Sequence, residues 1–156
     1  MQKGQILIEA ILALVVAVVI ISAISGAAIT SVNNSSFSRD QNQATDYATQ
    51  GIEVLRQQSE TNWTNFSTYR GTYCFDSNST LTSGTCSSAN LGGSANNYFV
   101  RQVQITQNSP KCGAIATEVS VTVSWADGKC INSSTTYCHQ VSLNSCLANI
   151  GAVPAP

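Results

Sequence analysis

Six cysteines and a single histidine are the residues of this 156-residue chain with the most chemical possibilities. The cysteines all lie beyond residue 70: Cys74, Cys86, Cys112, Cys130, Cys138 and Cys146. Two chemistries use such residues, namely disulfide formation in an oxidising compartment and zinc coordination. Zinc sites favour short spacings such as Cys-x-x-Cys, which the sequence lacks. The even count therefore predicts a disulfide framework and no metal.

Other catalytic chemistry has little support in the sequence. In an extended strand His139 shares a side with Tyr137 and Val141, which predicts a packed side chain rather than a base. No G-x-S-x-G nucleophile motif or Gly-rich phosphate loop occurs. Asp127-Gly128 indicates a turn, and few acids are near it to bind calcium. Charged residues make up 10% of the chain and the net charge is -1, so no basic surface for nucleic acid is expected. We expect no enzyme and no cofactor.

A carboxylate stands inside an apolar segment near the start of the chain. Ile6 to Ile29 is a run of Ile, Leu, Val and Ala broken by Glu9, two serines and Gly26. As a helix it is about 36 Å long, enough to span a hydrocarbon core of about 30 Å. Lys3 precedes the run and no cationic cluster follows, which predicts a cytoplasmic N-terminus and a C-terminus outside.

The position of Glu9 leaves several readings open. The run could be a secretory signal peptide cut among the small residues 22–27, or a plain signal anchor. Glu9 could lie near enough to the interface to stay hydrated. A carboxylate at a membrane-helix centre costs about 2.5–3.5 kcal/mol on insertion scales, so a buried Glu9 calls for a partner.

Residues 3–14, K-G-Q-I-L-I-E-A-I-L-A-L, resemble the class III signal of type IV pilins and pseudopilins. The resemblance implies a leader that ends at Gly4, cleavage by a prepilin peptidase, and N-methylation of Gln5. Glu9 then stands fifth in the mature chain, where the family carries its assembly glutamate. The family usually begins its mature chain with Phe or Met, where this chain has Gln5.

The resemblance implies a minor pilin or pseudopilin, a structural subunit of a type IV pilus or of a related type II secretion or competence pseudopilus. The implied partners are the prepilin peptidase, other pilin or pseudopilin subunits, the inner-membrane assembly platform and the membrane, with no nucleic acid. The protein is expected first as a single-pass membrane protein and then in an extracellular or periplasmic filament. The alternative is a membrane-anchored or secreted surface adhesin that does not polymerise.

A second helical pattern follows the apolar run. Six residues recur at helical spacing: Ala44, Tyr47, Ala48, Gly51, Ile52 and Leu55. This stretch also resembles the amphipathic half-helix of minor pilins. Gly26 and Asn33–Asn34 mark places where the helix could bend or melt. We predict five segments: a leader (1–4), a transmembrane and assembly helix (5–30), its amphipathic continuation (31–60), a globular head (61–150) and a flexible tail (151–156).

Strand patterns are confined to the head. Residues 61–97 are rich in Ser, Thr, Asn and Gly, and we expect a loop region held by aromatic residues and one disulfide. Alternating patterns predict strands at 98–106, 117–125 and 137–143. The expected fold is α+β and pilin-like: a long N-terminal helix packed on a small antiparallel sheet stapled by disulfides.

The strand order constrains the disulfides. Cys112 and Cys130 flank the middle strand, whose length of about 30 Å far exceeds the Cα separation of bonded cysteines, about 7 Å at most. In an antiparallel meander Cys112 instead shares one end with Cys146, and Cys130 shares the other with Cys138. Elimination leaves Cys74 with Cys86. We predict these three pairs.

Overall fold

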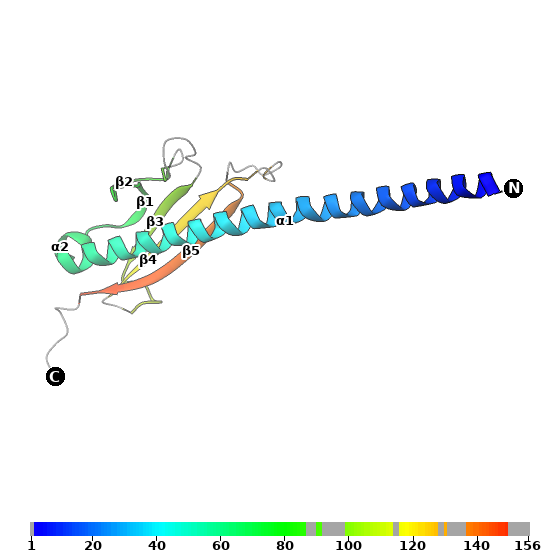
Figure 1. Cartoon of the computed structure of the whole chain (residues 1–156). Coiled ribbons are helices and arrows are strands. Elements are labelled where there is room, and N and C mark those ends of the chain that lie inside the picture. Colours follow the sequence, from blue (N-terminus) through cyan, green and yellow to red (C-terminus); the bar gives the residue numbers. More distant parts are fainter. Residues whose placement is uncertain are drawn as a thin grey trace. The chain divides into compact units, whose positions relative to one another are not determined.

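The computed structural model describes residues 2–86, 90–91, 99–113, 116–127, 130 and 137–149, with side chains described from residue 7 onward. The chain divides into two compact units, Met1–Arg39 and Asp40–Pro156. Helix α1 (Gln2–Thr61) belongs to both units (Figure 1). The predicted tail, residues 151–156, lies outside the described residues.

The first part of α1 is helical at every described residue, including Gly26 and Asn33–Asn34. Melting at these positions is therefore absent from the structure. Hydroxyl side chains bond back to the helix instead: Ser22 Oγ donates to the Val18 carbonyl at 2.8 Å, and Thr30 Oγ1 donates to the Gly26 carbonyl at 3.0 Å. These bonds satisfy the polar groups within the helix itself, which an apolar environment requires.

The second unit contains a five-stranded antiparallel sheet in the order β2-β1-β3-β4-β5 (Figure 1). The strands are β1 (Gly71–Phe75), β2 (Leu81–Ser83), β3 (Val100–Gln107), β4 (Ala116–Trp125) and β5 (His139–Ala148). A short helix, α2 (Trp63–Phe66), follows α1. The predicted meander of the last three strands and the α+β class are confirmed.

The expectation of a loop with little regular structure over residues 61–97 was wrong. This region contains α2, β1 and β2, and β1 pairs with β3 through partners such as Tyr73 and Val103. A five-residue strand shows too little alternation to stand out, and its order depends on the free edge that β3 offers. The expected role of aromatic residues is confirmed, because Phe66, Tyr69 and Tyr73 stack edge to face in sequence.

The last strand was predicted too short, because β5 continues to Ala148 rather than stopping at residue 143. Polar residues, Asn144 and Ser145, follow residue 143. β4 extends back to Ala116, which pairs with Ala148, so the neighbouring strand provides hydrogen-bond partners that carry β5 through this polar stretch.

All three predicted disulfides are present. Cys74 bonds to Cys86, Cys112 to Cys146 and Cys130 to Cys138, with Cα separations of 4.8, 5.5 and 5.6 Å respectively. Two of the three link the opposite ends of the β4–β5 pair, as the meander requires.

The core lies between one face of α1 and one face of the sheet. The predicted helix stripe is confirmed, since Ala44, Ala48 and Leu55 are fully buried. On the sheet side, alternate residues of β3 and β4 face inward: Val103, Ile105, Val119, Val121, Val123 and Trp125. Burial of this apolar surface is the main stabilising contribution, at about 25 cal/mol per Å².

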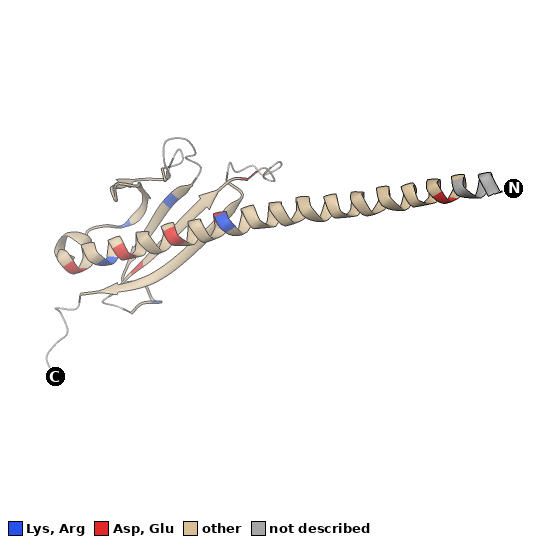
Figure 2. Ribbon diagram, viewed as in Figure 1, with Lys and Arg blue, Asp and Glu red and all other residues tan. Residues whose placement is uncertain are grey.

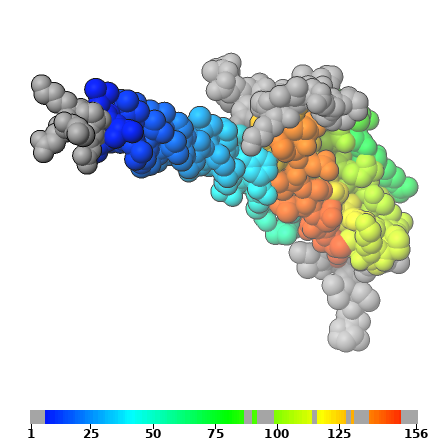
Figure 3. Space-filling model, turned by 90° about the vertical axis from the view of Figure 1, so that its right-hand side faces the viewer, coloured from blue at the N-terminus to red at the C-terminus, as the bar shows by residue number. Residues whose placement is uncertain are grey.

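The opposite face of the sheet is polar. The hydroxyl groups of Ser120 and Thr122 on β4 lie 3.3 and 3.1 Å from that of Ser142 on β5. Figure 3 shows β5, in orange, at the molecular surface. One solvated face and one buried face is the usual arrangement of an antiparallel sheet.

One charged side chain lies inside the core. Arg101 on β3 is 1% exposed, and its guanidinium lies 4.3 Å from the centre of the Phe75 ring. It donates to the carbonyl oxygens of Asp76 at 2.6 Å, Tyr47 at 3.1 Å and Phe75 at 3.3 Å. Burial lowers the pKa of Arg101 to about 10, an effect that the Asp76 carboxylate opposes, so the group stays charged at neutral pH.

At Gly51, α1 packs closely against the sheet. A Cβ atom there would lie 3.0 Å from Val121 Cγ1 and 3.2 Å from Arg101 Cδ. Val121 is fully buried, so it has little room to move. A larger side chain must push the helix away from the sheet.

We therefore expect Gly51→Val to lower the free energy of unfolding by about 1–3 kcal/mol through overpacking. Thermal unfolding of the full chain in detergent, followed by near-ultraviolet circular dichroism, measures the change. Gly26→Val is the matched control, because a Cβ at Gly26 meets nothing within 4 Å. Equal melting temperatures for the two variants would contradict the proposed close contact.

Candidate membrane and assembly segment

The first unit exposes an apolar helix surface. Residues 10–38 contain no charged side chain, and Figure 2 shows this part of α1 free of blue and red between Glu9 and Arg39. Its large aliphatic side chains are at least half exposed, from 50% for Val16 to 66% for Leu12. By length and composition this is the one helix of the described chain that could cross a membrane.

The residues singled out by the N-terminal motif all lie on this helix. Gly4 and Gln5 are in its first turns, where only the backbone is described, and Glu9 is exposed one turn later. Within the described part of the chain, no side chain forms an ion pair or hydrogen bond with the Glu9 carboxylate. A partner for Glu9 in an apolar environment must therefore come from outside the described chain.

His139, the second residue singled out in the sequence, lies in the head. Its ring packs against Trp125 with centroids 5.4 Å apart, and Nε2 lies 3.2 Å from Asp127 Oδ2. The sequence indicated only a turn at Asp127. The β4–β5 register supplies the missing signal, because Trp125 pairs with His139 and Asp127 follows Trp125 by two residues.

Two sulfur atoms complete this cluster. The ligand atoms of Asp127, Cys130, Cys138 and His139 all lie within 4.8 Å of one another. Cys130 and Cys138 are joined as a disulfide, so neither sulfur is the thiolate that zinc binds. The Cys130–Cys138 disulfide and the His139–Asp127 contact therefore hold one end of the β4–β5 pair together.

Comparison of the chain with protein-family models, curated proteins and solved structures gave no match. The features of the chain that bear on its function are therefore the apolar helix, Glu9 within it, and the residues before Glu9.

The apolar segment should fail to enter a membrane when a charge is placed at its centre. An aspartate there costs about 2.5–3.5 kcal/mol on insertion scales, so we expect Val18→Asp to reduce the membrane-integrated fraction strongly. Alkaline carbonate extraction of membranes from expressing cells measures that fraction.

Ser36→Asp provides the control, because residue 36 lies beyond the apolar run and is already exposed to solvent. Its integrated fraction should match that of the unmodified chain. If Val18→Asp were retained as fully as Ser36→Asp, the segment would not be the membrane anchor.

Proposed function

We propose that this chain is a minor pilin or pseudopilin, a structural subunit of a type IV pilus or of a related type II secretion or competence pseudopilus. The observation that carries the proposal is the register of Gly4, Gln5 and Glu9 directly before a charge-free, exposed apolar helix. A prepilin peptidase cuts after Gly4 and methylates the new amine of Gln5. The membrane then holds the subunit until the assembly platform extracts it into the filament.

Glu9 has a physical role in this assembly. Cleavage creates a positive amine at Gln5, and the carboxylate of one subunit pairs with the amine of its neighbour when the apolar helices stack. The pair removes the penalty of leaving a carboxylate desolvated, and it sets the axial register between subunits. The exposure of Glu9 and of the large apolar side chains around it supports this role.

The apolar surface of the N-terminal helix must be shielded from water. Soluble monomers rarely expose large continuous apolar patches, and lipid or other apolar helices are the two environments that suit this one. A subunit that moves from the membrane into a filament exchanges contacts with lipid for contacts with the apolar helices of its neighbours. The exposed side chains from Leu7 to Val32 are consistent with both states.

Mass spectrometry of the N-terminal peptide from protein isolated from its native membrane tests the processing step. We expect a peptide that starts at Gln5, with or without a methyl group. An unmethylated Gln5 can cyclise, and the mass of that product is included in the search. A start at Met1 indicates a plain anchor, and a start near residues 25–28 a secreted domain; either result favours the adhesin and rejects the pilin route.

Replacing Glu9 by valine tests the assembly step. We expect Glu9→Val to insert into the membrane as well as the unmodified chain, because it removes a polar group from the apolar run. Incorporation into sheared filaments should fall by roughly tenfold or more, since the loss of one partner leaves the Gln5 amine unpaired in an apolar environment. Quantitative immunoblotting of membrane and filament fractions measures both quantities.

Glu60→Val is the matched control, because this exposed glutamate lies on the same helix but in the second unit. It should leave incorporation unchanged. Normal incorporation of Glu9→Val would remove the carboxylate from the assembly mechanism.

A further inference from the structure

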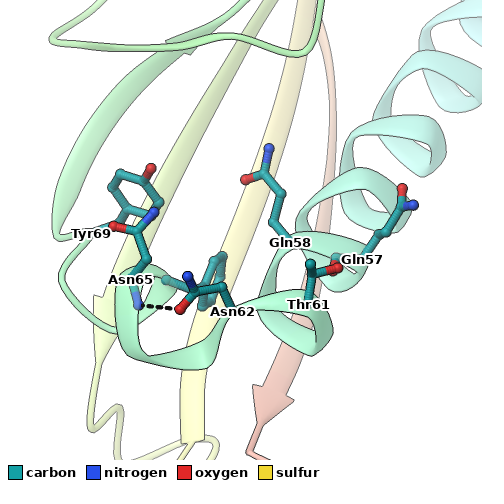
Figure 4. Close-up of a pocket in the computed structure, with 7 residues that line it drawn as sticks. Gln57, Gln58, Thr61, Asn62, Asn65 and Tyr69 are labelled. Atoms are coloured by element: carbon teal, nitrogen blue, oxygen red, sulfur yellow. Dashed lines mark hydrogen bonds between the residues drawn. The ribbon is translucent and has the colours of Figure 1, made fainter.

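An open groove of 360 Å³ lies in the head where α1 ends and α2 begins. Figure 4 shows the side chains around it, from the last turns of α1 and from the segment that contains α2. Six of the lining residues carry hydrogen-bonding side chains: Gln57, Gln58, Thr61, Asn62, Asn65 and Tyr69. Phe66 contributes a buried aromatic ring to the wall.

The polar groups of this groove are available to a ligand. For the carboxamides of Gln57, Gln58 and Asn65, the described part of the chain supplies no hydrogen-bond partner. Asn62 Oδ1 accepts from the Asn65 backbone N–H at 3.0 Å, which leaves the amino group of Asn62 as a donor. Each free carboxamide offers a donor and an acceptor side by side.

The walls of the groove are held in place by bonds within the head. Asn62 caps α2, and Thr61 Oγ1 donates to the Gln57 carbonyl at 2.8 Å. Gln107 Nε2, on β3, donates to the Tyr69 carbonyl at 3.0 Å and so ties this wall to the sheet. Fixed walls reduce the entropy lost when a ligand binds.

From this lining we infer that the groove binds a neutral saccharide. No lining residue is charged, so nothing in the groove favours an anion or a cation. An apolar ligand would leave the carboxamides without partners, which is costly on desolvation. Adjacent sugar hydroxyls match the paired donor and acceptor of a carboxamide, and the exposed part of the Tyr69 ring offers an apolar surface for the sugar C–H groups.

This inference concerns the head alone and does not depend on filament assembly. The test uses the full chain, solubilised in a zwitterionic detergent because maltoside and glucoside headgroups are themselves saccharides. A printed array of neutral, sialylated and sulfated oligosaccharides is probed first. Titration with the bound neutral oligosaccharides, followed by saturation-transfer nuclear magnetic resonance, then gives dissociation constants for the unmodified chain and its variants.

We expect binding to neutral oligosaccharides, weakened about fivefold or more by Gln57→Ala and by Asn65→Ala, since each removes hydrogen bonds to the ligand. Gln57 is exposed, so its truncation leaves folding intact, which circular dichroism verifies. Gln41→Ala is the control, as an exposed carboxamide on α1 outside the groove, and it should bind normally.

Four results would overturn the inference, and the first three come from the array and the variants. They are the absence of binding across the array, binding that none of the groove variants weakens, and a preference for sialylated or sulfated glycans. Displacement of the bound glycan by a short uncharged peptide at lower concentration than by free sugar would likewise reject it and assign the groove to peptide amides.

Discussion

The guanidinium of Arg101 is the interaction on which the arrangement of the head depends. A charge removed from water costs several kcal/mol unless hydrogen bonds replace its hydration. Here the replacement comes from backbone carbonyls of separate segments, Tyr47 on α1 and Phe75 and Asp76 at the end of β1. The charge is satisfied only when helix, β1 and β3 are all in place. One side chain therefore couples the position of α1 to that of β1, a strand that the sequence did not predict.

The long helix is adapted to two different solvents along its length. From Ala10 to Ile29 its side chains are apolar apart from two serines, whose hydroxyls donate to carbonyls of the helix itself. From Asp40 onward only one face is apolar, and that face contacts the sheet. A mostly polar stretch, residues 30–39, separates the apolar run from this second part. The same secondary structure thus serves first as a lipid-compatible rod and then as one layer of a water-soluble domain.

Local patterns were enough to predict some of this structure. Unbroken alternation in residues 117–125 gave the central strand, and strand length with cysteine positions gave all three disulfides. The burial of Arg101 was missed because charged side chains are rarely buried. Its position on the same strand face as Val103 and Ile105 was the available signal. The strand at Gly71–Phe75 and the Asp127–His139 contact also depend on neighbours distant in sequence. The site at Gln57–Tyr69 arises from a turn between two helices, whose shape the residue types alone do not specify.

The two disulfides around the β4–β5 pair also decide how the head responds to mechanical tension. Cys112 and Cys146 are separated by 34 residues in the chain but are directly joined through sulfur. About 120 Å of polypeptide, at roughly 3.5 Å per residue, therefore cannot be drawn out when the ends of the protein are pulled apart. The load passes across the covalent bridge and bypasses β4 and most of β5. A head built in this way keeps its C-terminal hairpin together under forces that would unravel an unlinked sheet.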